Sequence, residues 1–229
     1  MKRYVNRIAG STRYAMALQE IWAAFNEDST IQKRVARSKA DTAAAYVHDA
    51  VLHDLIMIIV RLMDKPGGHG RPVMQSDRIS FPVVRELLTL PGVMEVFETR
   101  ARGWPGGKGE EHVKRVRDEF QDMCGRIDRL QSGSDTPAEL LRTYRHNNLA
   151  HELHIDTSDP KPKAKYGDVP DLLNEIVALT ESAGLIVLGT AYAWERRDVA
   201  KSAKALWAAV AEIGPPLDNE NPEPVGVAQ

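Results

Sequence analysis

The apolar residues of this 229-residue chain recur with the three- and four-residue spacing of helices, and we find no convincing strand bounded by turn signals. This pattern favours an all-α architecture. A chain of this length can bury a substantial core, so we expect one helical domain over residues 1–214, a bundle with short additional helices. The proline-rich and acidic segment PPLDNENPEPVGVAQ predicts a flexible tail over residues 215–229.

Capping residues and helix breakers divide the domain into helices. We expect them over residues 11–26 with Ser11 as the cap, from about 28–30 to 64, and then over 81–90, 92–101, 110–130, 170–195 and 198–213. A further helix is expected to begin at Thr136, where Pro137 occupies the first turn and Glu139 completes a capping box. The long second helix is apolar nearly all round in its last turns, LIMIIV, and is therefore predicted to be the most buried.

Charge and cysteine content limit the classes of partner and compartment. The chain has 30 basic and 32 acidic residues, so a nucleic-acid partner would have to be held by a local patch. The single cysteine, Cys124, excludes an intramolecular disulfide and fits a reducing compartment. No apolar run has the length of a signal peptide or of a membrane span, which takes about 20 residues. We expect a cytoplasmic protein that does not enter a membrane.

The segment LRTYRHNNLAHELH at residues 141–154 places polar groups where a helix should finish its packing. On an ideal helix, Arg145, Asn148 and His151 form a ridge on the side of Leu140, Leu141, Tyr144 and Leu149. A partly buried arginine without a partner is costly, so the ridge must be compensated. Three alternatives are open: Glu152 or an acid of a neighbouring helix pairs with Arg145, two ridges meet across a dimer axis, or the ridge waits for an anion.

The segment LRTYRHNNLAH resembles the signature of the HEPN superfamily, an arginine followed by a polar residue and, a few positions on, a histidine. The stretch DLIMIIVRLMD, the later FPVVRELLTLPGV and the LAH ending resemble the abortive-infection U-type (AbiU-like) branch of that superfamily. The resemblance covers about residues 40–200. It implies a helical bundle that dimerises so that two motifs share one cleft and, for active members, a metal-independent ribonuclease.

The residue types of the motif suit RNA cleavage without a metal or cofactor. Histidine has an ordinary pKa of about 6.5, so His151 can take the proton of a ribose 2′-hydroxyl. Arg145 remains charged and can hold two phosphate oxygens at once. The expected products carry a 2′,3′-cyclic phosphate and a 5′-hydroxyl, and a second motif from a partner chain would supply the acid for the leaving oxygen. This hypothesis requires that internal carboxylates do not neutralise the ridge.

Supporting roles are predicted for three neighbours of the catalytic pair. Asn148 lies between Arg145 and His151 on the ridge and can contact phosphate or orient the histidine, although structural packing is the slightly favoured alternative. His146 matches the polar position of the family motif but points away from the ridge unless the helix is distorted. Tyr144 shares the ridge side of the helix.

Candidate RNA-binding side chains also lie outside the motif. Arg61 and Asp64 have a spacing that permits a local ion pair, and the alternative is that Arg61 reaches the shared cleft. An extended basic loop follows the motif and can track an RNA backbone or serve as a solvated linker. Its lysines are Lys161, Lys163 and Lys165.

No metal site is predicted, because His48 and His53 have poor spacing for one ion and His151 with His154 has Glu152 as the only local acid. The resemblance implies a homodimer acting on RNA in phage defence or toxin-like growth arrest, and it leaves room for an antitoxin or regulatory partner. The alternative is a non-catalytic module that uses the same cleft to bind RNA, a nucleotide or a protein.

Overall fold

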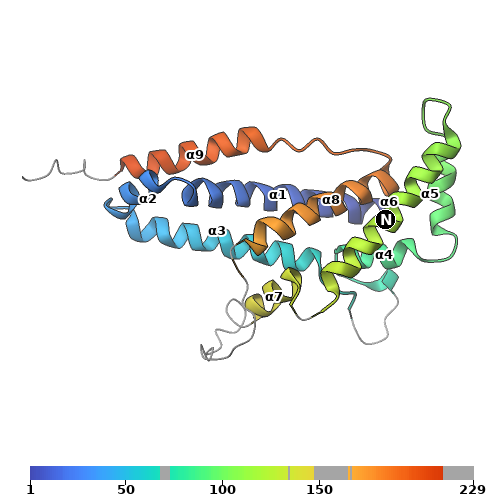
Figure 1. Cartoon of the computed structure of the whole chain (residues 1–229), viewed down its shortest axis with the longest axis horizontal. Coiled ribbons are helices and arrows are strands. Elements are labelled where there is room, and N and C mark those ends of the chain that lie inside the picture. Colours follow the sequence, from blue (N-terminus) through green and yellow to red (C-terminus); the bar gives the residue numbers. More distant parts are fainter. Residues whose placement is uncertain (68–72, 134, 147–164, 166, 214–229) are drawn as a thin grey trace, which may run out of the picture. The chain divides into compact units, whose positions relative to one another are not determined.

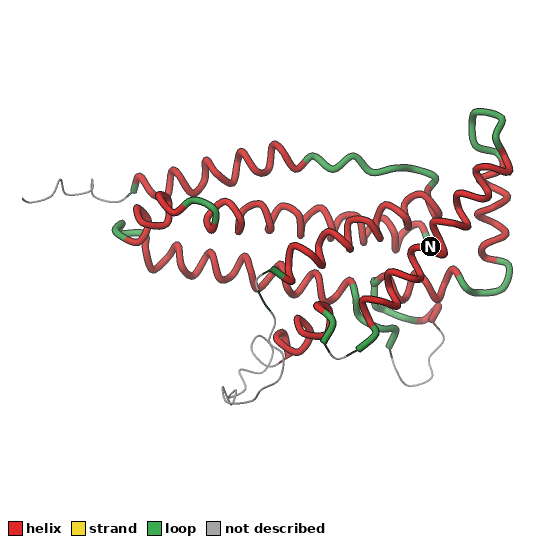
Figure 2. The backbone as a smooth tube through the Cα atoms, viewed as in Figure 1, coloured by secondary structure: helices red, strands yellow, loops and turns green. Residues whose placement is uncertain are grey.

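The computed structural model describes residues 1–67, 73–133, 135–146, 165 and 167–213. Every regular element within these ranges is a helix, which confirms the predicted all-α class (Figures 1 and 2). The predicted tail over residues 215–229 lies outside the described residues. The helices are α1 (Lys2–Asn26), α2 (Ser29–Ala36), α3 (Asp41–Leu62), a short 3₁₀ helix η1 (Val73–Gln75), α4 (Phe81–Leu88), α5 (Val93–Arg102), α6 (Gly109–Gln131), α7 (Pro137–Tyr144), α8 (Asp168–Leu188) and α9 (Arg196–Glu212).

The first helix is longer than the sequence predicted. It begins at Lys2, so Ser11 lies inside the helix and the prediction that Ser11 is its cap is wrong. The buried side chains of Val5 and Ile8 explain the difference, because they continue the apolar stripe of this helix toward the N-terminus.

The predicted second helix is divided into α2 and α3. Asp28 begins α2, since its carboxylate accepts the backbone N–H groups of Thr30 and Ile31. After α2 ends, the hydroxyl of Ser38 accepts the N–H of Ala40 at 3.1 Å. This side-chain bond satisfies a backbone donor outside the helix, and the chain turns there without proline or glycine.

The helix α8 is shorter at its C-terminus than the range 170–195 predicted from the sequence. It ends at Leu188 because Gly189 adopts a left-handed conformation with φ of 71°. The N–H of Gly189 then donates to the carbonyl of Leu185 at 3.0 Å, which closes the last turn. The glycine is also close to Trp104, whose Nε1 would lie 3.0 Å from an added Cβ.

The described chain forms two compact units. Unit 1 contains Met1–Met16 and His53–Trp194, and unit 2 contains Ala17–Leu52 and the described residues from Glu195 onward. The boundary after Met16 falls within α1, and the boundary before His53 falls within α3. The single domain over residues 1–214 stays a prediction.

Unit 1 is built around α8, which packs against α6 and α7 (Figure 1). The side chains of α8 that fill this core are Leu172, Leu173, Ile176, Leu179, Ala183, Ile186 and Val187. The hydroxyls of Thr12 and Thr180 form a buried hydrogen bond of 2.9 Å, which joins α1 to α8 and satisfies both groups. Helices α4 and α5 also pack against α6. Helices α6 and α8 together position α7, which leads into the candidate site.

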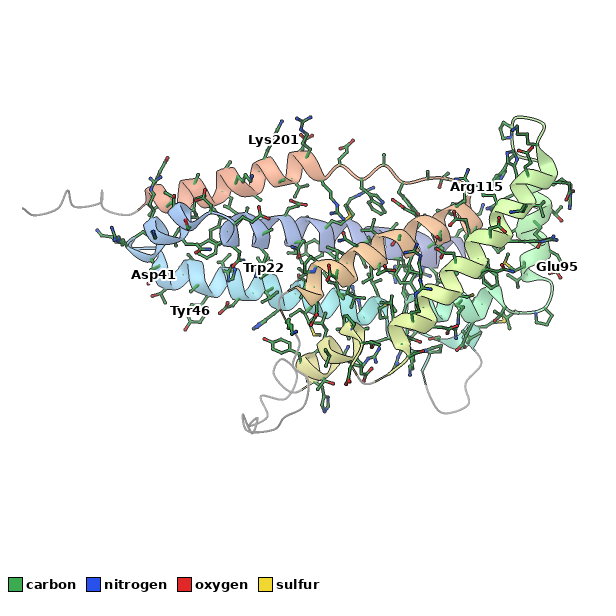
Figure 3. The ribbon with its side chains drawn as sticks, in the orientation of Figure 1. Trp22, Asp41, Tyr46, Glu95, Arg115 and Lys201 are labelled. Carbon is green, nitrogen blue, oxygen red and sulfur yellow. The ribbon has the colours of Figure 1, made fainter. Side chains whose placement is uncertain are left out.

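Unit 2 has a small core in which α2 packs against α9. Trp207 is its largest buried side chain, and its indole N–H donates to the carbonyl of Ile21 at 2.8 Å. The Phe25 ring lies 4.7 Å from the ring of Trp207. The part of α3 in this unit is largely exposed, and Tyr46, at 73% exposure, projects from it into solvent (Figure 3).

The apolar helix α3 contains both exposed and buried stretches. By length and composition alone it satisfies the requirements for crossing a membrane, which the core helices of soluble proteins satisfy as well. The stretch that the sequence marked as most buried, residues 55–60, is indeed buried except for Met57. Within unit 1, the buried side chains of this stretch belong to the core.

Candidate functional site

The helix α7 that leads into the motif begins as the sequence predicted. Pro137 occupies the first turn, and the hydroxyl of Thr136 accepts the N–H of Glu139 at 3.4 Å. The Glu139 carboxylate forms an ion pair with Arg142, and it closes no capping box with the described residues. Leu141 is buried, and α7 packs against α6 and α8, so the C-terminal end of α7 is anchored within unit 1.

The motif residues that the structure describes leave regular α-helical geometry. The α-helix ends at Tyr144, and Arg145 and His146 continue in a π-helical turn. Such turns insert an extra residue into the helical repeat and occur often at functional sites. The spacing assumed for an ideal wheel therefore changes here, which is the distortion that would let His146 turn toward the ridge. Tyr144 and Arg145 are half-buried, while His146 is exposed.

Arg145 lies beside one carboxylate from another part of unit 1. Its Nη1 is 3.6 Å from Oδ2 of Asp64, just past the end of α3, and the two side chains are 25% and 22% exposed. An acid of a neighbouring helix thus faces Arg145, which is one of the compensations that the sequence left open. The separation exceeds a hydrogen bond, and Arg145 forms no hydrogen bond to a described residue, so its N–H donors are not consumed by this pair.

The predicted ion pair between Arg61 and Asp64 is not formed, and that prediction is wrong. Helix α3 ends at Leu62, so Asp64 lies beyond the helical spacing that would bring the two side chains together. The N–H of Asp64 bonds to the carbonyl of Arg61 at 3.2 Å in a tighter turn. Arg61 is exposed and makes no ion pair with any residue in the described ranges.

The end of α3 is held by four side chains from three separate segments. The carbonyl of Met63 accepts bonds from Gln131 at 3.0 Å and from Arg142 at 3.3 Å. The hydroxyl of Ser80 donates to the carbonyl of Asp64 at 2.6 Å, and the guanidinium of Arg78 donates to the carbonyl of Lys65 at 2.7 Å. These donors satisfy carbonyl groups that have no partner inside the helix, so the backbone that carries Asp64 is fixed.

Asp64 also forms part of the wall of a cavity within unit 1. The cavity has a volume of about 530 Å³ and polar side chains dominate its wall. Its lining residues are Arg7 and Ser11 of α1, Arg61 and Asp64 at the end of α3, and Asp77, Arg78 and Ile79 before α4. Because Asp64 faces both this cavity and Arg145, the end of α3 joins the cavity to the motif.

Several predicted site residues lie outside the described part of the chain. They are Asn148, His151, Lys161 and Lys163, together with Glu152 and His154. The structure therefore brings together Arg145, Asp64 and Arg61 near one helix end but does not place the catalytic histidine. Lys165 is exposed, and its backbone N–H donates to the carboxylate of Asp168 at 2.6 Å at the start of α8.

The described residues meet the requirements of neither a metal site nor a reactive thiol. No group of three or more His, Cys, Asp or Glu side chains is arranged there to hold an ion. His48 instead bonds to the Asn26 side chain at 2.9 Å and stacks beside Trp22. Burial raises the pKa of the Cys124 thiol, which keeps it in its unreactive protonated form.

Sequence analysis missed two arginines of this region, Arg7 and Arg78. Arg7 belongs to the part of α1 that was not predicted to be helical, and Arg78 lies in a loop without a recognisable pattern. A signal existed only for Arg7, because Val5 and Ile8 continue the apolar spacing around it. Nothing in the order of residues indicates that Arg7, Arg61 and Arg78 share a cavity.

Comparison with known families agrees with the resemblance of the motif. The HEPN family model described as AbiU2 matches residues 2–204, which cover nearly all of unit 1, the candidate site and the part of unit 2 before residue 205. No curated protein and no solved structure matches the chain.

Proposed function

Because the chain belongs to the AbiU2 family of HEPN proteins, which is related to abortive infection, we propose that it is a metal-independent endoribonuclease. Its substrate is RNA, which it cleaves to 2′,3′-cyclic phosphate and 5′-hydroxyl ends in phage defence or toxin-like growth arrest. The observation that carries the proposal is the state of Arg145. Its guanidinium lies in a π-helical turn, and among the described residues it faces one carboxylate, at 3.6 Å, and forms no hydrogen bond, so donors remain for a phosphate.

In the proposed reaction, His151 removes the proton of a ribose 2′-hydroxyl, and that oxygen attacks the adjacent phosphorus. The bond from phosphorus to the 5′-oxygen breaks, and the leaving oxygen takes a proton. Arg145 stabilises the charge that develops on the phosphate oxygens, an effect worth about 3–4 kcal/mol per donor in preorganised sites. The RNA supplies its own nucleophile, so neither a metal ion nor an organic cofactor is required.

A homodimer completes the site in this proposal. One motif contributes one base and one fixed cation, and the motif of the second copy contributes the acid that protonates the 5′-oxygen. Exposed apolar side chains of α3, Tyr46 and Val47 at 73% and 50% exposure, are available for such an association. The proposal places the dimer in the cytoplasm, where RNA is available and Cys124 stays reduced, with an antitoxin or another regulatory protein as a further partner.

The carboxylate of Asp64 favours one other function. It partly neutralises Arg145, as expected in a non-catalytic module that holds RNA, a nucleotide or a protein in the same cleft. In such a module His151 has no chemical role. Binding would then persist without cleavage, which separates the two functions by experiment.

The test is cleavage of single-stranded RNA by the purified full chain in excess EDTA. We expect wild-type protein to cut the RNA and His151→Ala to lose at least about 10²-fold in rate, the lower end of the contribution from general acid–base catalysis. His53→Ala is the matched control, because His53 is exposed on α3 and does not line the cavity, and it should cut at the wild-type rate.

Thermal unfolding of each variant checks that the fold is retained. Cyclic phosphate ends should appear on the 5′ fragments, and their absence would exclude the proposed route. Tight RNA binding by wild-type protein with no cutting would replace the nuclease by the binding module.

A further inference from the structure

The cavity beside the end of α3 contains more positive charge than the catalytic motif requires. Its lining includes Arg7, Arg61 and Arg78, which come from α1, from α3 and from the segment before α4. All three segments belong to unit 1. The proposed reaction assigns a role to Arg145 alone, so these three arginines are not explained by it.

Two of these arginines have no carboxylate partner in the described part of the chain. Arg7 and Arg61 are both exposed and form no ion pair there. Arg78 uses Nη1 in a bond to the carbonyl of Lys65, which leaves the remaining donors of its guanidinium available. A protein that needed these side chains for stability would be expected to pair them, so they are available to an anion.

The negative charges of the cavity do not cancel this excess. Asp64 and Asp77 are its two acids, and Asp64 is shared with Arg145, which lies 3.6 Å away. Counting Arg145 with the three arginines of the wall, the neighbourhood has two more positive than negative side chains. A phosphodiester carries one negative charge, so its binding reduces the imbalance.

The helix end beneath the cavity does not repel an anion as an open helix C-terminus would. Uncapped carbonyl groups at a helix C-terminus carry partial negative charge. At the end of α3, the carbonyls of Met63, Asp64 and Lys65 already accept bonds from side chains. The donors at Met63 and Lys65 include the guanidiniums of Arg142 and Arg78, which offset that partial charge.

We propose that the arginine pocket, formed by Arg7, Arg61 and Arg78, binds a phosphate group of the RNA strand next to the phosphate held at Arg145. The identity of the strand as substrate rests on the proposed function. Guanidinium groups bind phosphate oxygens in pairs of hydrogen bonds, and three arginines line one cavity of about 530 Å³, which can hold a phosphate with part of its sugar. Asp64 separates this subsite from Arg145 and sets the register between the two phosphates.

The test measures RNA binding apart from cleavage. The full chain with His151→Ala is titrated with a fluorescent single-stranded RNA between 50 and 200 mM KCl, roughly the range over which counterion release is measured. Adding Arg61→Ala or Arg7→Ala should weaken binding about tenfold, the loss of one charge-assisted hydrogen-bond pair. Each should also reduce the slope of log K against log salt by about 0.7, one phosphate contact on a single strand.

Two further variants control for charge and for geometry. Arg197→Ala removes an exposed arginine of unit 2 that does not line the cavity, and it should change neither the affinity nor the slope. Arg61→Lys keeps the charge but loses the paired geometry, so it should keep the slope and recover only part of the affinity. Arg78 is left unchanged, because its bond to Lys65 also holds the helix end.

The possible outcomes separate this proposal from the nuclease proposal. If Arg61→Ala and Arg7→Ala bind RNA with wild-type affinity and slope, the arginine pocket is not a phosphate subsite, whether or not the wild-type protein cuts RNA. If both weaken binding while wild-type protein fails to cut, the pocket is supported and the nuclease proposal is wrong. Inorganic phosphate at millimolar concentration distinguishes a free anion from the strand: if RNA binding does not depend on these arginines but phosphate binding does, the proposed ligand is wrong.

Discussion

The arginines between α5 and α6 differ from those at the end of α3 in the carboxylates that surround them. Arg117 donates two hydrogen bonds to Glu98, at 2.7 and 2.6 Å, and Arg102 donates to Glu110 at 2.7 Å. At the end of α3, Arg61 pairs with no described residue and Arg145 has one carboxylate at 3.6 Å. Both regions belong to unit 1, so the same unit neutralises one set of arginines with close carboxylates and, among the described residues, leaves the other set without a carboxylate at hydrogen-bond distance.

The same contrast applies to α6 as a whole. Arg126 lies between two carboxylates, Asp122 at 2.6 Å and Glu175 at 3.1 Å, and Arg115 lines a second cavity together with acidic residues of α6 and α8. In that region Arg126 is neutralised by carboxylates that α6 and α8 supply. The difference teaches that a high content of charged residues does not by itself indicate a binding site, because the fold can neutralise arginines with its own carboxylates.

The largest expected effect is on cleavage. Replacing Arg145 with alanine should lower the rate of RNA cleavage about 10²–10³-fold, because it removes the cation at the reacting phosphate. Arg117→Ala, which removes an arginine already neutralised by Glu98, should leave the rate unchanged. Initial rates with a single-stranded RNA in EDTA measure both.

The comparison would break if Arg145→Ala kept its cleavage rate and lost several degrees of melting temperature. Arg145 would then be a structural partner of Asp64, which is the alternative in which an acid of a neighbouring helix compensates the arginine.

A smaller effect is expected on thermal stability, where the paired arginine should matter more than the unpaired one. Arg126→Ala should lower the melting temperature by about 2–4 °C, since it leaves two carboxylates without their cation. Arg61→Ala should change it by no more than about 1 °C, because Arg61 is exposed and unpaired within the described ranges. Thermal unfolding followed by circular dichroism measures both, and equal losses would show that Arg61 is held by the fold as Arg126 is.

The smallest effect concerns pH. The hydrogen bonds from Arg117 lower the pKa of Glu98. The ionised form is favoured in the folded state, so this contribution to stability is complete above the ordinary glutamate pKa of about 4.3 and is lost as the pH falls through the lower folded value. Glu98→Gln should reduce the melting temperature by about 1 °C at pH 7, and the difference should disappear in strong acid. A difference that grows on acidification would contradict this assignment.

Much of the fold follows from local patterns. The helical spacing of apolar residues predicted the all-α class, and Thr136 with Pro137 marked the start of α7 correctly. The helix boundaries that were wrong depended on weaker local signals. Ser38 interrupts the predicted second helix with one side-chain bond, and Gly189 ends α8 through a left-handed conformation that other residues rarely adopt.

The candidate site was predicted only in part. Arg145 was identified from its position in the motif, and the family match supports the resemblance on which the catalytic pair rests. The expected pair of Arg61 with Asp64 is not formed, and Asp64 faces Arg145 instead. The pairing of residues three apart requires both to lie in one helix, whereas Asp64 follows the end of α3. His151 and Asn148 lie outside the described residues, so their roles stay predictions.

The sequence by itself determined that this chain forms amphipathic helices and that an arginine, followed by the rest of a HEPN motif, stands at the end of one of them. Both properties are local, since helix formation and capping depend on residues a few positions apart. Only the tertiary structure decided that Asp64 faces Arg145 and that Arg7, Arg61 and Arg78 surround one cavity. Electrostatic pairing depends on distance in space, and these side chains come from segments that are far apart in the sequence.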